Sequence, residues 1–95
     1  MEKPYDDINL NENEFIRVFH SNTAIEELVW HRDLKDREVR VVKGVGWKLQ
    51  MDDCLPSYLH EGDVFQIPAM KYHRILKGVT DLILEIKEQG IKRYG

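Results

Sequence analysis

Cysteine is nearly missing from this sequence of 95 residues: Cys54 stands alone, so no disulfide can form within the chain. A chain without disulfides suits a reducing compartment, and we expect a cytoplasmic protein. No apolar run approaches the roughly 18 residues that are needed to cross a bilayer. The acidic start of the chain also lacks the apolar stretch of a signal peptide. We therefore expect no association with a membrane.

Clustered positive charge is missing as well. The chain has 17 acidic residues against 14 basic ones, a net charge of −3, and no basic run is longer than two residues. A surface that follows a phosphate backbone needs clustered lysine and arginine. The sequence therefore predicts a protein that does not bind nucleic acid.

Long helical patterns are missing after residue 24. Short stretches rich in β-branched and aromatic residues instead alternate with turn residues, which is typical of an antiparallel sandwich or barrel. The stretch 14–20 fits a helix or a strand, and we favour a strand because its successors are strand-like. The other predicted strands span 25–31, 37–43, 47–51, 64–67, 72–76 and 81–87.

The length of the chain predicts a single domain, because so few residues can build only one core. No linker, repeat or low-complexity segment interrupts the sequence. We expect residues 1–20 to form an N-terminal arm or edge strand. Residues 21–90 then form a single barrel, and residues 91–95 form a short tail.

One stretch combines a turn, a short strand and a histidine at a fixed spacing. Gly62 can adopt the positive φ of a tight turn, and Asp63 stabilises such turns through side-chain hydrogen bonds. Pro68 ends the strand after five residues, and His73 follows after four more. This spacing resembles the second conserved motif of the cupin superfamily, although Met70 stands where that family often has a glycine.

The first cupin motif has a weaker counterpart in this chain. In the family it carries two histidines separated by one residue, then a glutamate, then a glycine. Here His31 takes the first histidine position, Asp33 the second and Arg37 that of the glutamate, and Gly44 follows after six residues. The resemblance implies an all-β fold, a small antiparallel β-barrel or jelly roll with an N-terminal arm.

The resemblance also implies a metal site, with His31, Asp33 and His73 as its ligands. The family uses three imidazoles and one carboxylate, whereas two imidazoles and one carboxylate remain here. That is the ligand count of a facial triad with open positions. His31 and Asp33 are two residues apart and so point to one face of a strand. The implied cofactor is one divalent ion of Fe, Mn, Ni or Zn, or none.

Arg37 is the objection to a metal, because it lies on the face of its strand that we assign to the interior. A guanidinium group cannot ligate a metal and repels one at close range. A buried charge must also find an anion, and Asp33 is the nearest candidate, followed by Asp36. If Asp33 pairs with Arg37, two histidines alone make a weak site. Glu38 could serve as a further ligand only if a bulge turned its side chain inward.

Arg37 could instead recognise a ligand. Its planar group suits a carboxylate or phosphate at the mouth of a barrel. Tyr72 would add a hydrogen bond and Trp47 a flat wall for a ring or a sugar. A third possibility is that Arg37 and Asp33 only close the end of the barrel as an ion pair.

These alternatives leave three functions open. The first is a metal-dependent cupin enzyme, an oxygenase or isomerase that acts on a small metabolite. The second is a metal-free barrel that binds a small polar or anionic ligand as a sensor, carrier or isomerase. The third is a structural, regulatory or assembly module without small-molecule chemistry, which we rank below ligand binding. Exposed sheet edges and apolar residues predict a homodimer.

Overall fold

A computed structural model describes residues 4–23 and 29–89 of the chain. Within these residues every regular element is a strand, and no helix is long and apolar enough to cross a membrane. The strands are β1 (Tyr5–Asn9), β2 (Glu14–Phe19), β3 (Arg37–Lys43), β4 (Lys48–Met51), β5 (Ser57–Tyr58), β6 (Val64–Ile67), β7 (His73–Leu76) and β8 (Leu82–Glu88).

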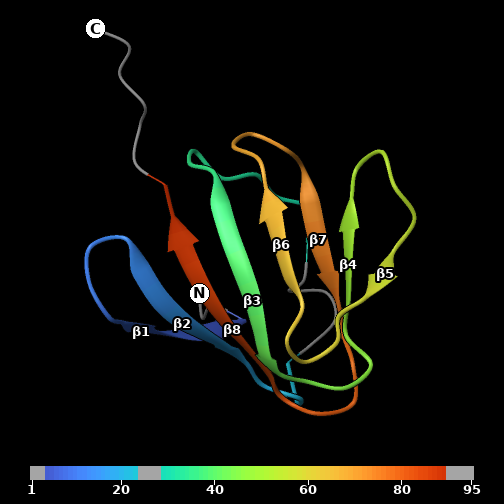
Figure 1. Cartoon of the computed structure of the whole chain (residues 1–95). Helices are drawn as coiled ribbons and strands as arrows, with labels where there is room; N and C mark the ends of the chain where they lie inside the picture. The colour runs from blue at the N-terminus through green and yellow to red at the C-terminus, as the bar shows by residue number, and fades with distance from the viewer. Residues whose placement is uncertain (1–3, 24–28, 90–95) are drawn as a thin grey trace, which may run out of the picture.

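The strands form two sheets that face each other (Figure 1). The larger sheet has the order β1-β2-β8-β3-β6, and the smaller has the order β5-β4-β7. All pairings within both sheets are antiparallel. The expected all-β antiparallel fold is therefore confirmed.

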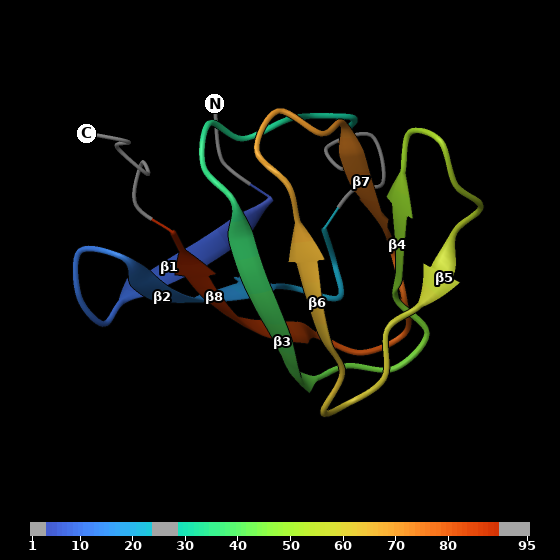
Figure 2. The same cartoon turned by 45° about the horizontal axis from the view of Figure 1, so that its top comes forward.

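The core lies between the two sheets because side chains alternate between the faces of each strand. In β2 and β8 alternate residues are buried, and the remaining ones are more exposed. The buried apolar side chains form one cluster: Phe15, Phe19, Val39, Val41, Trp47, Leu49, Leu59, Ile67, Ile75, Leu82, Leu84 and Ile86. The turned view in Figure 2 shows the two layers from another side.

Several strand predictions are confirmed, since β3 and β6 have the predicted bounds and β8 is shifted by one residue. Residues 14–19 of the stretch 14–20 form strand β2, as favoured above. Residues 24–28 of the predicted strand 25–31 lie outside the described residues, and Val29 and Trp30 are not in a strand. The first residues of the chain supply β1, which pairs with β2 of the same chain.

Candidate metal centre and cavity

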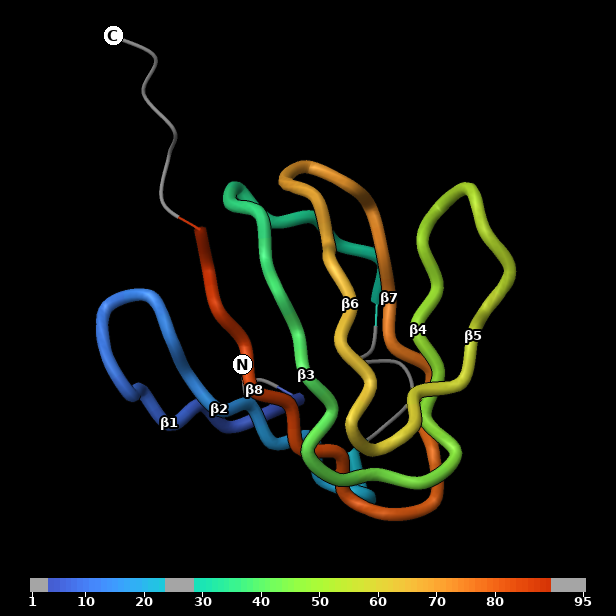
Figure 3. The backbone as a smooth tube through the Cα atoms, viewed as in Figure 1, coloured from blue at the N-terminus to red at the C-terminus, as the bar shows by residue number. Residues whose placement is uncertain are grey.

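The motif residues meet at one end of the two-sheet structure. Arg37 is the first residue of β3, His73 is the first of β7, and Glu88 is the last of β8. The segment that leads into β3 crosses this end from the side of β7, as the tube in Figure 3 shows. His31 and Asp33 lie in this crossing segment.

The two histidines are held together by their own backbones. The N–H of His31 donates to the carbonyl of His73 at 3.0 Å, and the N–H of His73 donates to the carbonyl of His31 at 2.9 Å. Their rings lie edge to face, with centroids 4.3 Å apart. The strand bridge therefore brings together two imidazoles that are 42 residues apart in sequence (73 minus 31).

Backbone carbonyls also fix the tautomer of each ring. Nδ1 of His31 lies 3.0 Å from the carbonyl oxygen of Val29, and Nδ1 of His73 lies 2.8 Å from that of Lys71. A carbonyl oxygen only accepts hydrogen bonds, so each Nδ1 carries the proton. In the neutral ring Nε2 then presents a lone pair, the arrangement in which a histidine binds a metal.

Asp33 is placed beside the histidines by the turn before β7. The N–H of Met70 donates to the carbonyl of Asp33 at 2.7 Å. Met70 has a φ of 66°, in the left-handed region that favours glycine. Met70 therefore adopts a conformation that a glycine would adopt more easily.

One carboxylate oxygen of Asp33 is buried and poorly satisfied. Oδ2 lies 3.3 Å from Nε2 of His73 and 3.2 Å from Nη1 of Arg37, but neither contact has the geometry of a hydrogen bond. When His73 is neutral its proton is on Nδ1, and two acceptors then face each other across 3.3 Å. Such a pair needs a proton or a cation between its atoms.

Arg37 is shared between two carboxylates. Its Nε and Nη2 both lie 3.1 Å from Oε2 of Glu88, while its Nη1 contacts Asp33. Asp33 therefore faces both His73 and Arg37. Glu88 matches the charge of Arg37, so the group Asp33, Arg37 and Glu88 keeps a net charge of −1.

The protonation states suit a cation. His31 is partly exposed, but partial burial of its ring lowers its pKa below the usual value, and the hydrogen bond to the Val29 carbonyl opposes this only in part. Burial alone would raise the pKa of Asp33, but the contact with His73, where its Nε2 carries a proton, and the charge of Arg37 outweigh burial and hold that pKa below its usual value. At neutral pH the site therefore presents a neutral His31 and an ionised Asp33.

These three residues could hold a metal ion. One ligand atom from each of His31, Asp33 and His73 lies within 4.8 Å of the other two. Small side-chain rotations would close this spacing onto an ion with bonds of about 2.0–2.2 Å. The poorly satisfied Oδ2 and the two Nε2 lone pairs are the donors that such an ion requires.

A cavity of about 320 Å³ lies between the sheets and includes this site in its lining. Most of the other lining side chains are apolar and come from both sheets, among them Val39, Leu49, Ile75 and Leu84. The volume lies at the small end of the range for ligand pockets. The three candidate metal ligands thus line a cavity with room for a small molecule.

Two residues predicted as ligand contacts lie away from the cavity. Trp47 is fully buried, packs 5.8 Å from the ring of Phe19, and donates from Nε1 to the carbonyl of Thr80 at 2.6 Å. A side chain so enclosed offers no wall to a ligand. Tyr72 is 41% exposed and stacks with Arg32 at 5.0 Å instead of lining the cavity. Both predictions required the side chain to point into the cavity, and neither Trp47 nor Tyr72 lines it.

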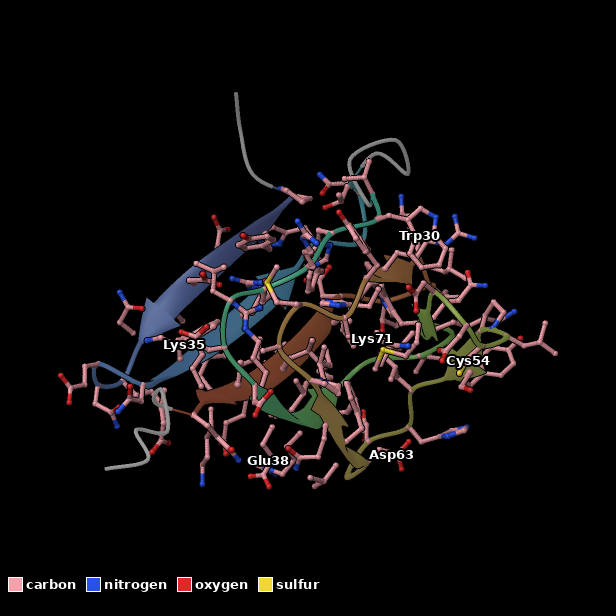
Figure 4. All side chains as sticks on the ribbon, turned by 90° about the horizontal axis from the view of Figure 1, so that it is seen from above. Trp30, Lys35, Glu38, Cys54, Asp63 and Lys71 are labelled. Carbon is pink, nitrogen blue, oxygen red and sulfur yellow. The ribbon has the colours of Figure 1, made fainter. Side chains whose placement is uncertain are left out.

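Glu38 does not replace the missing glutamate ligand. It accepts a hydrogen bond from Nε2 of Gln66 at 3.1 Å on the exposed side of β3. In the view of Figure 4, Glu38 and Asp63 lie on the side of β3 and β6, whereas Trp30 and Cys54 lie on the side of the smaller sheet. No bulge turns Glu38 inward, since the irregularity of β3 lies between Val41 and Lys43.

Sequence reasoning missed two charged residues of the site. Glu88 lies one residue beyond the predicted end of the last strand, so it was not considered as a partner of Arg37. Arg17 lines the cavity and forms a bidentate ion pair with Asp7, with distances of 2.8 and 3.0 Å. Its alternation with Phe15 and Phe19 was the available signal that Arg17 faces inward.

No protein-family model matches the chain, and no curated protein matches it in sequence. Solved structures do match its fold. A candidate mannose-6-phosphate isomerase from Ralstonia eutropha JMP134 gives a TM-score of 0.67 at 21% identity, over 92% of this chain and 83% of that one. A cupin domain from Bordetella pertussis gives a TM-score of 0.61 at 20% identity, over 95% of this chain and 99% of that one.

A cupin-2 domain protein from Shewanella frigidimarina is also similar, with a TM-score of 0.62 at 17% identity over 90% of this chain and 79% of that one. At such identities the likeness concerns the fold. The resemblance noted in the sequence is therefore confirmed, and the chain has the fold of the cupin superfamily.

Proposed function

We propose that this protein binds a small molecule in its cavity beside a divalent metal ion held by His31, Asp33 and His73. The observation that carries the proposal is the buried Oδ2 of Asp33, which lies opposite Nε2 of His73 without a hydrogen bond. An ion between these atoms would satisfy both. The cavity next to these atoms has room for the ligand.

The donor set favours the transition metals named from the sequence. Two imidazole nitrogens and one carboxylate oxygen suit Fe(II), Mn, Ni or Zn and leave coordination positions open. When bound, such an ion supplies a Lewis acid for an oxygen donor of the ligand. An oxygenase or isomerase reaction stays a prediction, because such a reaction requires the bound ion.

The neighbouring residues of the chain would prepare the site. The carbonyls of Val29 and Lys71 orient the two rings and, in the neutral rings, leave the lone pair on each Nε2. Arg37 holds Asp33 from one side while Glu88 balances the charge of Arg37. The apolar walls exclude water from the bound ligand.

A second candidate is a metal-free barrel, and the contact between Arg37 and Asp33 at 3.2 Å favours it. In that case the ion pair closes the end of the barrel, and His73 would be a donor to Asp33 in its doubly protonated form. The protein would then be a structural, regulatory or assembly module, or a carrier that needs no metal.

Elemental analysis separates these functions. We expect about one metal ion per chain after incubation with Fe(II), Mn, Ni or Zn and desalting, and loss of that metal in His31→Ala and His73→Ala. His60→Ala is the matched control, because His60 is exposed and contacts Asp63 outside the cavity. Metal that persists in both site variants, or wild type that retains none, would refute the metal site.

A further inference from the structure

The cavity wall restricts which molecules can bind. Six of the buried side chains that line it are aliphatic: Val39, Leu49, Ile67, Ile75, Leu84 and Ile86. None of them can form a hydrogen bond with a ligand. A hydroxyl group placed against this wall would lose its hydrogen bonds to water and gain none in return.

The polar groups of the lining are mostly occupied. Both guanidinium groups are already matched by carboxylates, Arg17 by Asp7 and Arg37 by Glu88 and Asp33. In each histidine, Nδ1 already donates a hydrogen bond to a backbone carbonyl. What remains for a ligand is the cluster formed by the Nε2 atoms and Oδ2 of Asp33.

The charge at this end of the cavity changes sign when a metal binds. Arg17 and Asp7 cancel, and Asp33, Arg37 and Glu88 together leave −1, so an anion is repelled from the empty site. A divalent ion changes the local sum to +1, which one negative charge neutralises. An anion therefore depends on the metal for its binding, and one negative charge on the ligand is enough to neutralise the site.

We infer that the ligand is a small monocarboxylate with a compact apolar body. Its carboxylate oxygen takes an open position on the metal, and its body lies against the aliphatic wall. This inference rests on the proposed metal site. It disfavours sugar phosphates, which carry several hydroxyl groups and a second negative charge.

A series of straight-chain acids tests the inference. Titration calorimetry on the Zn(II)-loaded protein compares acetate, butyrate, hexanoate and octanoate, with hexanol and glucose 6-phosphate as references. Each buried methylene is worth about 0.8 kcal/mol, so affinity should rise about fourfold per methylene until the cavity is full. Hexanol, which lacks the carboxylate, should bind at least about tenfold more weakly than hexanoate.

Two further arms identify the site of binding. Chelation of the metal should abolish hexanoate binding, because the anion then meets a net negative site. In Ile75→Val the wall loses one methyl group, and the best chain length should shift upward. Ile83→Val is the matched control, because Ile83 lies on the other face of β8 and does not line the cavity.

The possible outcomes are distinguishable. Retained zinc with the expected rise in affinity supports the inference. Retained zinc with a flat series, or glucose 6-phosphate that binds as well as hexanoate, overturns the ligand class and leaves the metal site standing. A protein that retains no zinc overturns the proposed function, and with it this inference.

Discussion

At the scale of single residues, the site depends on how the charge of Arg37 is divided. Two of its nitrogens lie 3.1 Å from Glu88, and a third lies 3.2 Å from Asp33. All three side chains are largely buried, so water screens these contacts little. In the proposed metal site we therefore expect Glu88 to act as a positioning residue that keeps Asp33 available for a cation.

Glu88→Gln should weaken metal binding without removing a ligand. With the charge of Glu88 gone, Arg37 is left with Asp33 as its charged partner, and its positive charge then opposes the ion. Loss of such a supporting partner lowers metal affinity about 10- to 100-fold, which competition with a chelator measures. Glu85→Gln is the control, because Glu85 pairs with Arg40 and does not line the cavity. Equal affinity in both variants would contradict this role.

At the scale of elements, the turn between β7 and β8 is set by a close approach to Trp47. A Cβ at Gly78 would lie 2.5 Å from the backbone nitrogen of Trp47 and from the carbonyl oxygen of Val45. Such distances require the backbone to move. The turn therefore needs a glycine for space, whereas Gly62 needs its freedom for a φ of 90° in an open position.

Alanine substitutions can separate these two requirements. Gly78→Ala should lower the free energy of unfolding by about 2–3 kcal/mol, because it overpacks a buried contact. Gly62→Ala should cost about 1 kcal/mol, because only backbone conformation is strained. Urea denaturation measures both, and equal losses would show that contact with Trp47 is not the cause.

The hairpin of β1 and β2 carries a pH-sensitive contact. Nε2 of His20 lies 2.7 Å from Oδ2 of Asp6, and Nδ1 lies 4.0 Å from Asp81. The hydrogen bond with Asp6 raises the pKa of His20 above its usual value. A raised folded-state pKa means that the contact stabilises fully below about pH 6.5 and that the stabilisation is lost as pH rises through that pKa.

Titration of the His20 ring by proton NMR should therefore give a pKa above 6.5 in wild type and a lower one in Asp6→Asn. The stability of Asp6→Asn should fall below that of wild type at pH 5.5 and match it at pH 9. A difference in stability that persists at pH 9 would show that the substitution acts through packing and not through this pair.

At the scale of the whole molecule, the two sheets leave β1 and β6 as edges of the larger one. On and near β1, Ile8 and Leu10 are more than half exposed. Unpaired backbone groups beside apolar side chains favour association with another strand. We therefore keep the prediction of a homodimer, and size-exclusion chromatography with light scattering should give twice the chain mass of 11.3 kDa. A strict monomer at micromolar concentration would contradict it.

The sequence by itself determined the features that depend on neighbouring residues. Alternation gave the bounds of β3, and a short apolar run between a turn and Pro68 gave those of β6. Turn chemistry placed Gly62 at a positive φ, with Asp63 accepting a hydrogen bond from the backbone of His60. These signals are local, so they survive in a single sequence. The meeting of His31 and His73 is not local: the resemblance to the cupin motifs implied it, and their backbones pair directly.

Tertiary structure alone decided the remaining features, because they depend on strands that are distant in sequence. The pairing of β3 with β8 brought Glu88 to Arg37, and packing between the sheets buried Trp47 and formed the cavity. Alternation predicts the face on which a side chain lies. It does not predict which side chain of another strand lies opposite, and that pairing decides whether Asp33 can receive a metal.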